Sequence, residues 1–293
     1  MPILLRVLGV FPLPILHAVG TAVGWLVYVG SRRFRKYLRE NLEAAGYNEP
    51  AIWRAAVAEA GKGALELPAI WMRSQEEAAR LVVEVHGWGL IEIALAAGKG
   101  AILLTPHLGC WEITAQYASR LHPITVLYSP PKLQAAEPLM QHGRTREGMK
   151  SVRPDLSGLR TMLRALHKGE AIGILPDQVP GSGEGEWTEF FGRPAYTMTL
   201  VTRLAQSTGA PVLFVYAERL PRGRGYRLHV VPMPDPLPGE TPQRRLNRAI
   251  EGLVRRCPAQ YLWAYNRYKV PAGVEPPEQR EERGVRSKEN DGC

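Results

Sequence analysis

The chain has 293 residues and a formal net charge of +9 at pH 7, with a pI of about 9.6. This length can bury a sizeable core and suits one large domain. The three cysteines, Cys110, Cys257 and Cys293, include no C-x-x-C pair, which argues against a disulfide framework and a cysteine-based zinc site. The basic balance indicates an anionic partner, either nucleic acid or a membrane rich in anionic lipid.

The N-terminal segment predicts a membrane anchor, which we place at residues 1–31. Val7–Gly30 is a run of 24 residues without a formal charge, long enough to cross a bilayer. Two prolines and a histidine within it weaken an ordinary spanning helix, so spanning and re-entrant anchors both stay open, with a soluble core helix as the alternative. Ser31–Arg39 follows with five basic residues, a pattern that favours a cytoplasmic location for the rest of the chain.

Strand-like and helix-like patterns alternate through most of the remaining chain. Apolar residues at three- and four-residue intervals predict helices over Phe34–Ala45 and Ala51–Trp71. The strands predicted after them are Leu81–Val85, Ala101–Leu104, Ile124–Tyr128, Ala171–Leu175, Val212–Ala217 and Tyr226–Val231. The predicted helices are Leu90–Ala97, Trp111–Leu121, Leu133–Gln141, Leu156–His167, Tyr196–Ser207 and Pro242–Arg256, and Pro176–Glu189 is predicted to be a loop.

This alternation predicts an α/β layered domain over residues 32–270. Residues 271–293 contain almost no large apolar side chains and predict a disordered tail.

The octapeptide TPHLGCWE, Thr105–Glu112, connects the strand Ala101–Leu104 to the following helix. Gly109 permits a tight turn, and a carboxylate near a helix N-terminus is favoured by the helix dipole. A histidine held by a carboxylate can act as a general base towards a hydroxyl. Because open α/β sheets bind ligands beyond the carboxyl ends of their strands, we expect His107 and Glu112 to be a catalytic pair, against the alternative of a structural contact.

Two further segments carry candidate binding residues. Gln141–Lys150 contains Arg144 and Arg146, and two guanidinium groups in one loop suit a phosphate; a solvated charge run is the alternative. Asp177 lies just past the strand Ala171–Leu175, in the same layer as His107, where it either caps a loop or faces the site.

The chain lacks several motifs of other enzyme classes. It contains no H-E-x-x-H, no Walker-type phosphate loop and no complete dinucleotide-binding glycine fingerprint. The run GSGEG at Gly181–Gly185 is preceded by Pro180 rather than directly by a strand, unlike a nucleophile elbow. These patterns argue against a metalloprotease, nucleotidase, dehydrogenase or serine esterase.

TPHLGCWE resembles the H-x4-D/E motif of membrane-associated acyltransferases, specifically the H-x-G-N-W-E form of the lipid A biosynthesis (late) acyltransferase family. Cys110 stands where that family often has Asn, which leaves the His/Glu pair intact. Further family elements follow in the same order: G-R-x-R at Gly143–Arg146, P-D-x at Pro176–Asp177, FFGRP at Phe190–Pro194 and Y-L-W-x-x-x-R-x-K at Tyr261–Lys269.

The resemblance implies a layered α/β fold similar to that of glycerol-3-phosphate acyltransferase, with a central, mostly parallel or mixed sheet and an N-terminal apolar anchor helix. It also implies transfer of a fatty acyl chain from a thioester to a hydroxyl of a membrane glycolipid. The implied acceptor is the lipid A precursor, and the implied donor is acyl carrier protein, with acyl-CoA as the other possible donor. No cofactor or metal is expected.

The resemblance further implies roles for individual residues. His107 would take the proton of the acceptor hydroxyl, while Glu112 would fix the imidazole. Backbone amides near Gly109, or an arginine, would stabilise the oxyanion.

The implied substrate-binding residues lie further along the chain. Arg144 and Arg146 would hold a phosphate, and Asp177 would lie near the acceptor or these arginines. Arg267 would contact a head group, and Phe190–Pro194 with the helix after it would pack against the acyl chain.

The expected partners are acyl carrier protein and an anionic membrane with its glycolipid acceptor. Nucleic acid is not expected, because the basic charge clusters beside the apolar N-terminus rather than in a recognisable binding module. The expected location is the bacterial inner membrane, with the catalytic domain on the cytoplasmic side. The alternatives are the same chemistry on another glycolipid or an aminolipid, and a non-catalytic basic membrane-binding protein that has kept the fold.

Overall fold

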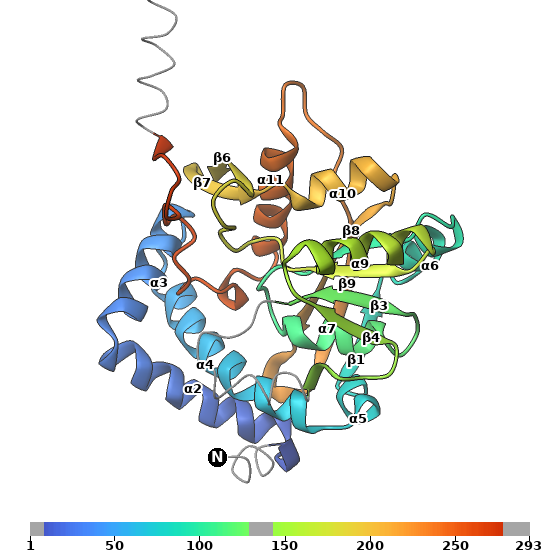
Figure 1. Ribbon diagram of the computed structural model, residues 1–293. Helices are drawn as coiled ribbons and strands as arrows, with labels where there is room; N and C mark the ends of the chain where they lie inside the picture. Colours follow the sequence, from blue (N-terminus) through green and yellow to red (C-terminus); the bar gives the residue numbers. More distant parts are fainter. Residues whose placement is uncertain (1–8, 129–142, 278–293) are drawn as a thin grey trace, which may run out of the picture.

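The structure, a computed structural model, describes residues 9–128 and 143–277, and its centre is a seven-stranded sheet (Figure 1). The strand order is β1-β9-β8-β2-β5-β3-β4, and all neighbours are parallel except the antiparallel pair β8–β9. The strands are β1 (Val82–His86), β2 (Ala101–Leu104), β3 (Ile124–Leu127), β4 (Met149–Val152), β5 (Ala171–Ile174), β8 (Val212–Arg219) and β9 (Tyr226–Pro232). This confirms the predicted α/β class and the mostly parallel sheet.

Helices cover both faces of the sheet. The longer ones are α2 (Leu13–Gly30), α3 (Arg32–Ala44), α4 (Pro50–Met72), α9 (Leu156–His167), α10 (Leu200–Thr208) and α11 (Pro242–Val254). The shorter ones are α5 (Gln75–Ala79), α6 (Gly89–Ala96), α7 (Trp111–Ala118) and the 3-10 turns η2 (Pro221–Gly223) and η3 (Pro258–Gln260). Figure 1 shows how they surround the central strands.

The central strands are buried on both faces, which explains why they read as continuous apolar runs. In β2, Ile102 and Leu104 join the core formed with α9, α10 and α11. The alternate residues Ala101 and Leu103 join a second core with α6 and α7, because successive strand side chains point to opposite faces. The turn that leaves β2 is therefore supported from both sides.

The N-terminal helix α2 packs along α4, and Figure 1 shows the two side by side. Glycines allow the close approach: a Cβ on Gly61 of α4 would lie 2.0 Å from the carbonyl oxygen of Gly20, and one on Gly24 would lie 2.3 Å from that of Val57. At the C-terminal end of α2, Tyr28 stacks on Trp53 of α4 with ring centroids 5.6 Å apart. The helix predicted from the apolar run is thus part of the folded domain.

Three local predictions differ from the structure. The helix predicted over Tyr196–Ser207 is the end of strand β7 (Arg193–Met198) followed by α10, and the loop predicted over Pro176–Glu189 contains most of strand β6 (Gly185–Phe190). β6 and β7 form an antiparallel hairpin, whereas the Gly-rich and acidic composition of Pro176–Glu189 favoured a loop. The edge strand β4 was missed because MKSV is short and half exposed.

Parts of other predictions lie outside the described residues. These are the predicted helix Leu133–Gln141, the first eight residues of the anchor and the predicted tail from residue 278 onwards.

Candidate functional site

The turn between β2 and α7 is held by three other parts of the chain. The N–H of Thr105 donates to Ile174 O of β5 at 2.9 Å, and that of Cys110 donates to Ala217 O of β8 at 2.8 Å. Gly109 has φ +63°, and a Cβ there would lie 2.0 Å from the same Ala217 oxygen. Glycine is therefore required at this position for both conformation and space.

The C-terminal segment that begins at Tyr261 supplies the third support. The N–H of Leu262 donates to the carbonyl oxygen of His107 at 3.0 Å, and Tyr261 pairs with Leu108 as an antiparallel bridge. Tyr261 and Trp263 are buried. The sequence did not indicate that the segment beginning at Tyr261 would fix the backbone of His107.

His107 is bound by Asp177, which lies at the end of the neighbouring strand β5. Nδ1 of the imidazole is 2.8 Å from Oδ1 of Asp177, and the backbone N–H of His107 donates to Oδ2 at 2.9 Å. Both residues are buried. Burial alone would raise the pKa of Asp177, but the imidazole and the hydrogen bonds from His107 outweigh it and hold that pKa below its usual value.

This contact sets the tautomer of the imidazole. An ionised carboxylate only accepts hydrogen bonds, so Nδ1 carries the proton that is donated to Asp177. Nε2 therefore keeps its lone pair in the neutral ring. The arrangement can take a proton at Nε2 and stabilise the resulting cation through Asp177.

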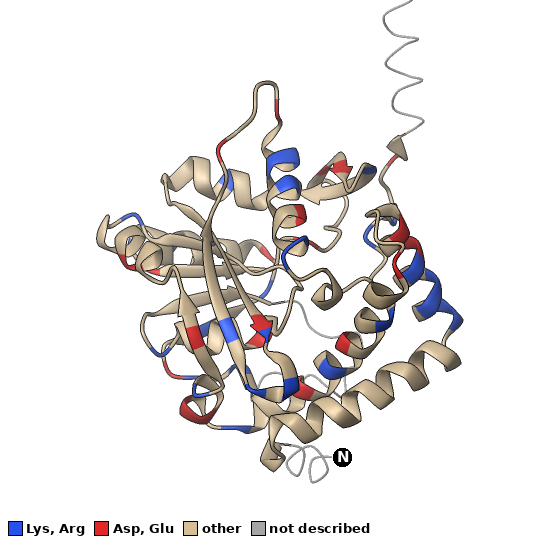
Figure 2. Ribbon diagram, turned by 180° about the vertical axis from the view of Figure 1, so that it is seen from behind, with Lys and Arg blue, Asp and Glu red and all other residues tan. Residues whose placement is uncertain are grey.

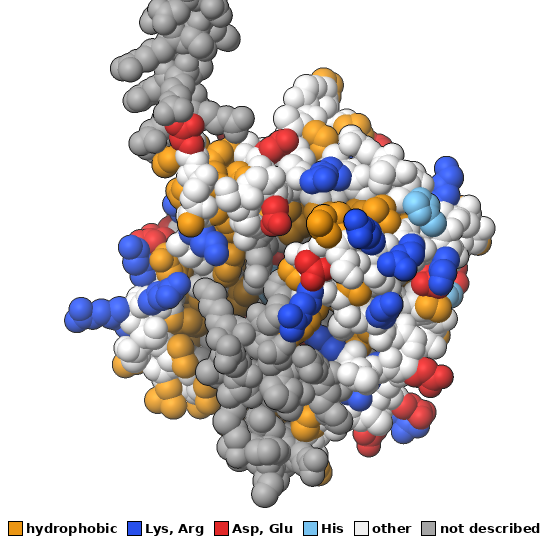
Figure 3. Space-filling view, in the orientation of Figure 1, with side chains coloured by type: hydrophobic (Ala, Val, Ile, Leu, Met, Phe, Trp, Pro, Cys, Tyr) orange, Lys and Arg blue, Asp and Glu red, His pale blue; other side chains and the backbone are white. Residues whose placement is uncertain are grey.

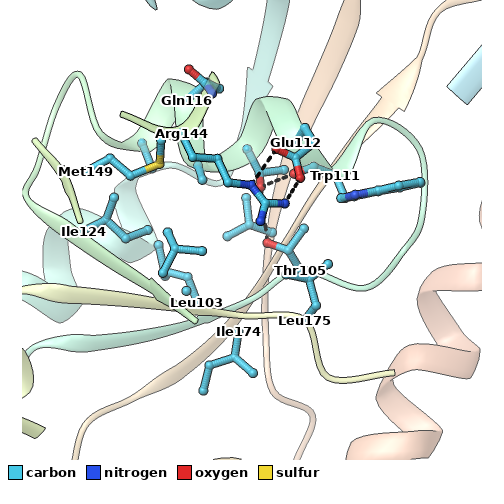
Figure 4. Close-up of a pocket in the computed structure, with 16 residues that line it drawn as sticks. Leu103, Thr105, Trp111, Glu112, Gln116, Ile124, Arg144, Met149, Ile174 and Leu175 are labelled. Carbon is cyan, nitrogen blue, oxygen red and sulfur yellow. Dashed lines mark hydrogen bonds and ion pairs between the residues drawn. The ribbon is translucent and has the colours of Figure 1, made fainter. Parts of the chain in front are cut away.

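Glu112 does not fix the imidazole, which corrects the expected His107–Glu112 contact. Its carboxylate accepts from the indole Nε1 of Trp71 at 3.0 Å. It also accepts from Arg144, through Nε at 3.2 Å and through a shorter bond from Nη2 (Figure 4). Glu112 is on the first turn of α7, and its side chain is held there by α4 and Arg144. Burial would raise its pKa, but Arg144 and Trp71 keep the pKa of Glu112 below its usual value.

The Arg144–Glu112 pair borders a small apolar pocket of about 40 Å³ between α7 and the sheet. Figure 4 shows the pair on one side, with Leu103, Ile124, Met149, Ile174 and Leu175 lining the rest. The lining of this pocket is mainly apolar, and the Arg144–Glu112 pair is its charged border.

The two arginines of the G-R-x-R element point to different partners. Arg146 donates from Nε to Gln116 Oε1 at 2.9 Å, and from Nη2 to the carbonyl oxygens of Trp71 at 3.1 Å and Arg73 at 2.7 Å. It thereby satisfies carbonyls at the C-terminus of α4, as basic side chains often do. Arg144 alone of the pair borders the pocket, so the expected joint phosphate clamp is not what the structure forms.

Arg267 is a packing residue rather than the head-group contact that the resemblance implied. It is 2 % exposed and donates to the carbonyl oxygen of Tyr196 and to Oγ1 of Thr197, both at 2.8 Å. Phe190 and Phe191, expected against the acyl chain, are also buried in the protein core.

Two residues at the site were not predicted. Trp71 was assigned only to a helix, and its contact with Glu112 depends on how α4 meets α7. Gln178 places its Nε2 at 3.1 Å from Nε2 of His107. Its position directly after Asp177 was the one signal that could have indicated it.

Comparison with known proteins agrees with these motifs. Residues 2–270 match the model of the family described as bacterial lipid A biosynthesis acyltransferase. The chain is 28 % identical over 274 residues to the lipid A biosynthesis lauroyltransferase of Escherichia coli (strain K12), covering 90 % of this chain and 88 % of the relative. It is also 28 % identical over 271 residues to the lipid A biosynthesis palmitoleoyltransferase of the same organism, covering 89 % and 88 %. This chain belongs to the bacterial lipid A biosynthesis acyltransferase family.

Proposed function

We propose that this protein transfers a fatty acyl chain from an acyl thioester to a hydroxyl of the lipid A precursor, a secondary acylation. Membership of the family and the names of the two Escherichia coli relatives support the acceptor. The single observation that carries the chemistry is the 2.8 Å contact between His107 Nδ1 and Asp177, which leaves Nε2 as a base.

In the proposed reaction the acceptor hydroxyl gives its proton to Nε2 of His107 while its oxygen attacks the thioester carbonyl carbon. The tetrahedral intermediate then collapses, the C–S bond breaks, and the sulfur leaves with the proton from Nε2. Asp177 stabilises the imidazolium between these steps. A positioned general base contributes about 10²–10⁴-fold to the rate, and no metal or redox cofactor is needed for these steps.

Arg144 is the proposed contact for a substrate phosphate. Glu112 holds its guanidinium at the border of the pocket, and a pre-oriented arginine suits phosphate recognition. The phosphate could belong to the glycolipid or to the phosphopantetheine arm of the donor.

Acyl carrier protein is the proposed donor partner. Helix α9 and the residues beside it expose basic side chains, namely Arg153, Arg160, Arg164 and Lys168, and Figure 3 shows basic residues on this face of the molecule. Such a surface attracts an acidic carrier and raises the rate of encounter.

The proposed attachment is to the surface of the cytoplasmic membrane, through α2. One face of α2 is packed against α4, whereas Ile15, Val19, Leu26 and Val29 on the other are 47–71 % exposed. The next helix, α3, is rich in basic residues, and Figure 2 shows them gathered there. An apolar face beside a basic cluster suits a helix that lies in the interface of an anionic membrane rather than across it.

A mass-spectrometric transfer assay tests the function. Membranes carrying the protein receive acyl carrier protein thioesters of several chain lengths and tetra-acylated lipid A precursor. We expect the precursor to gain the mass of one acyl group, with His107→Ala abolishing the gain. Thioester consumption with an unchanged precursor would transfer the proposal to another glycolipid or an aminolipid acceptor. No consumption by folded, membrane-bound protein would contradict the enzyme and favour a binding protein.

A further inference from the structure

The four backbone amides of the turn that carries His107, residues 107–110, are all engaged within the chain. An oxyanion hole needs donors about 2.7–3.1 Å from the developing charge, and amides near Gly109 were the expected source. The four consecutive N–H groups of residues 107–110 instead donate within the chain, to Asp177 Oδ2 at 2.9 Å, Pro106 O at 2.6 Å, Gln260 O at 3.0 Å and Ala217 O at 2.8 Å. These four amides are therefore occupied, and the side chains beside His107 become the candidate donors.

Gln178 brings such a donor to the reacting atoms. Its side-chain Nε2 lies 3.1 Å from Nε2 of His107, the nitrogen that takes the substrate proton in the proposed reaction. Because Asp177 fixes the proton on Nδ1, Nε2 can only accept, so the amide of Gln178 must present an N–H to it. The amide orientation is thus determined by the hydrogen-bond network.

The position of Gln178 in the chain fits this use. It follows Asp177 directly, so the end of β5 places both the carboxylate behind the imidazole and the amide in front of it. Gln178 is exposed whereas Asp177 is 2 % exposed. Its side chain can therefore meet a substrate from solvent without disturbing the core.

We infer that Gln178 is a catalytic residue that donates to the thioester carbonyl oxygen during acyl transfer, an inference that rests on the proposed function. In the free enzyme its N–H occupies the lone pair of His107 Nε2. The acceptor hydroxyl replaces it there, and the released N–H donates to the adjacent carbonyl oxygen. As the hydroxyl oxygen bonds to the carbonyl carbon, the π electron pair of the C=O bond moves onto the carbonyl oxygen, which accepts from Gln178. The pair returns when the C–S bond breaks, and Gln178 neither gains nor loses a proton.

The decisive variant is Gln178→Met, which keeps a similar length and removes the donor. We expect kcat to fall by about 10²–10³-fold, as for loss of one oxyanion donor, with KM for the acyl thioester changed less than about threefold because the interaction strengthens only in the transition state. Gln178→Glu should also lose kcat. Its carboxylate beside Nε2 should favour the imidazolium and so move the acidic limb of the kcat/KM pH profile to higher pH.

Gln75→Met is the matched control. Gln75 also presents a side-chain amide at the protein surface, where it donates to Ser119 Oγ at 2.7 Å, and we expect its kcat to equal that of the unmodified protein. A merely structural role for Gln178 would lower the thermal midpoint in both Gln178 variants and leave the pH profile unchanged.

The outcomes separate the inference from the proposed function. Equal kcat for the unmodified protein and Gln178→Met, while His107→Ala is inactive, would overturn the role of Gln178 and keep the acyltransferase. A rise in KM for the thioester with unchanged kcat in Gln178→Met would also overturn this role. Absence of transfer by the unmodified protein would instead contradict the proposed function itself.

Discussion

The two acidic residues of the site differ in what surrounds them. Asp177 faces the imidazole, and Glu112 faces a guanidinium and an indole N–H. Both keep a lowered pKa despite burial, because each has a cationic or hydrogen-bond-donating partner. The proposed reaction therefore uses Asp177 to support His107 as the base, and it places Glu112 on the binding side of the site.

Asp177→Asn tests the first of these roles. The amide keeps the volume but can present an N–H to Nδ1, which favours the tautomer with the proton on Nε2 and removes the base. We expect kcat to fall by about 10³–10⁴-fold in acyl transfer assays, similar in size to the effect of this change in serine-protease triads.

Glu112→Gln is the companion variant, measured in the same acyl transfer assay. It should raise KM for the phosphorylated acceptor more than it lowers kcat. A larger kcat loss in Glu112→Gln than in Asp177→Asn would contradict the assignment.

At the scale of elements, the contact between α2 and α4 depends on glycines. Gly61→Ala introduces a Cβ that would lie 2.0 Å from the carbonyl oxygen of Gly20, so the helices must separate. We expect a lower thermal midpoint and faster proteolysis within α2. Gly252→Ala is the control, since Gly252 is an exposed glycine of α11 with open space at its Cβ. It should raise stability by about 0.5–1 kcal/mol.

The outer face of α2 can be tested by membrane binding. Leu26 is 71 % exposed, and in the interfacial orientation its side chain enters the lipid. Burying a leucine contributes about 1.5–3 kcal/mol, so Leu26→Glu should weaken binding to phosphatidylglycerol vesicles about tenfold or more. Ile93 of α6, also 71 % exposed, supplies the control Ile93→Glu. Equal vesicle binding by the two variants would contradict the interfacial role of α2.

At the scale of the whole molecule, one buried ionic cluster joins α2, α4, β8 and β9. Glu66 accepts from His17 at 3.2 Å, from Tyr226 at 3.0 Å and from Arg219, whose Nη2 also donates to the carbonyl oxygen of Gly109 at 2.9 Å. The cluster thus links the proposed membrane helix to the turn that carries His107. Burial would raise the pKa of Glu66, but Arg219 and His17 outweigh it and lower the pKa from 4.5 to about 2.

Glu66→Gln should therefore cost stability in a pH-dependent way. A carboxylate with a lowered pKa stabilises the fold above its ordinary pKa of 4.5, and this contribution is lost as pH falls towards 2. Breaking a buried ion pair by removing one partner costs about 3–5 kcal/mol, so we expect that loss in urea unfolding at pH 7. The difference between the two proteins should shrink between pH 4.5 and 2. A difference independent of pH would contradict an ionised Glu66.

Much of the fold was predictable because its signals are local. The apolar run Ala101–Leu104, the glycine of the turn and the amphipathic pattern after it place His107 at the end of a strand without any knowledge of the rest. The same holds for Leu156–His167, where the predicted helix has the observed bounds. The hairpin β6–β7 was missed because its pairing, rather than its composition, makes it a sheet.

The sequence by itself determined the α/β class, the position of the histidine and the family. Only the tertiary structure decided which carboxylate contacts the imidazole of His107. Glu112 is five residues away but turns towards Arg144, whereas Asp177 is distant in sequence and adjacent in space. The reason is that β2 and β5 are parallel neighbours, whose carboxyl ends meet at one edge of the sheet. Strand order arises from packing across the whole domain, and no local pattern encodes it.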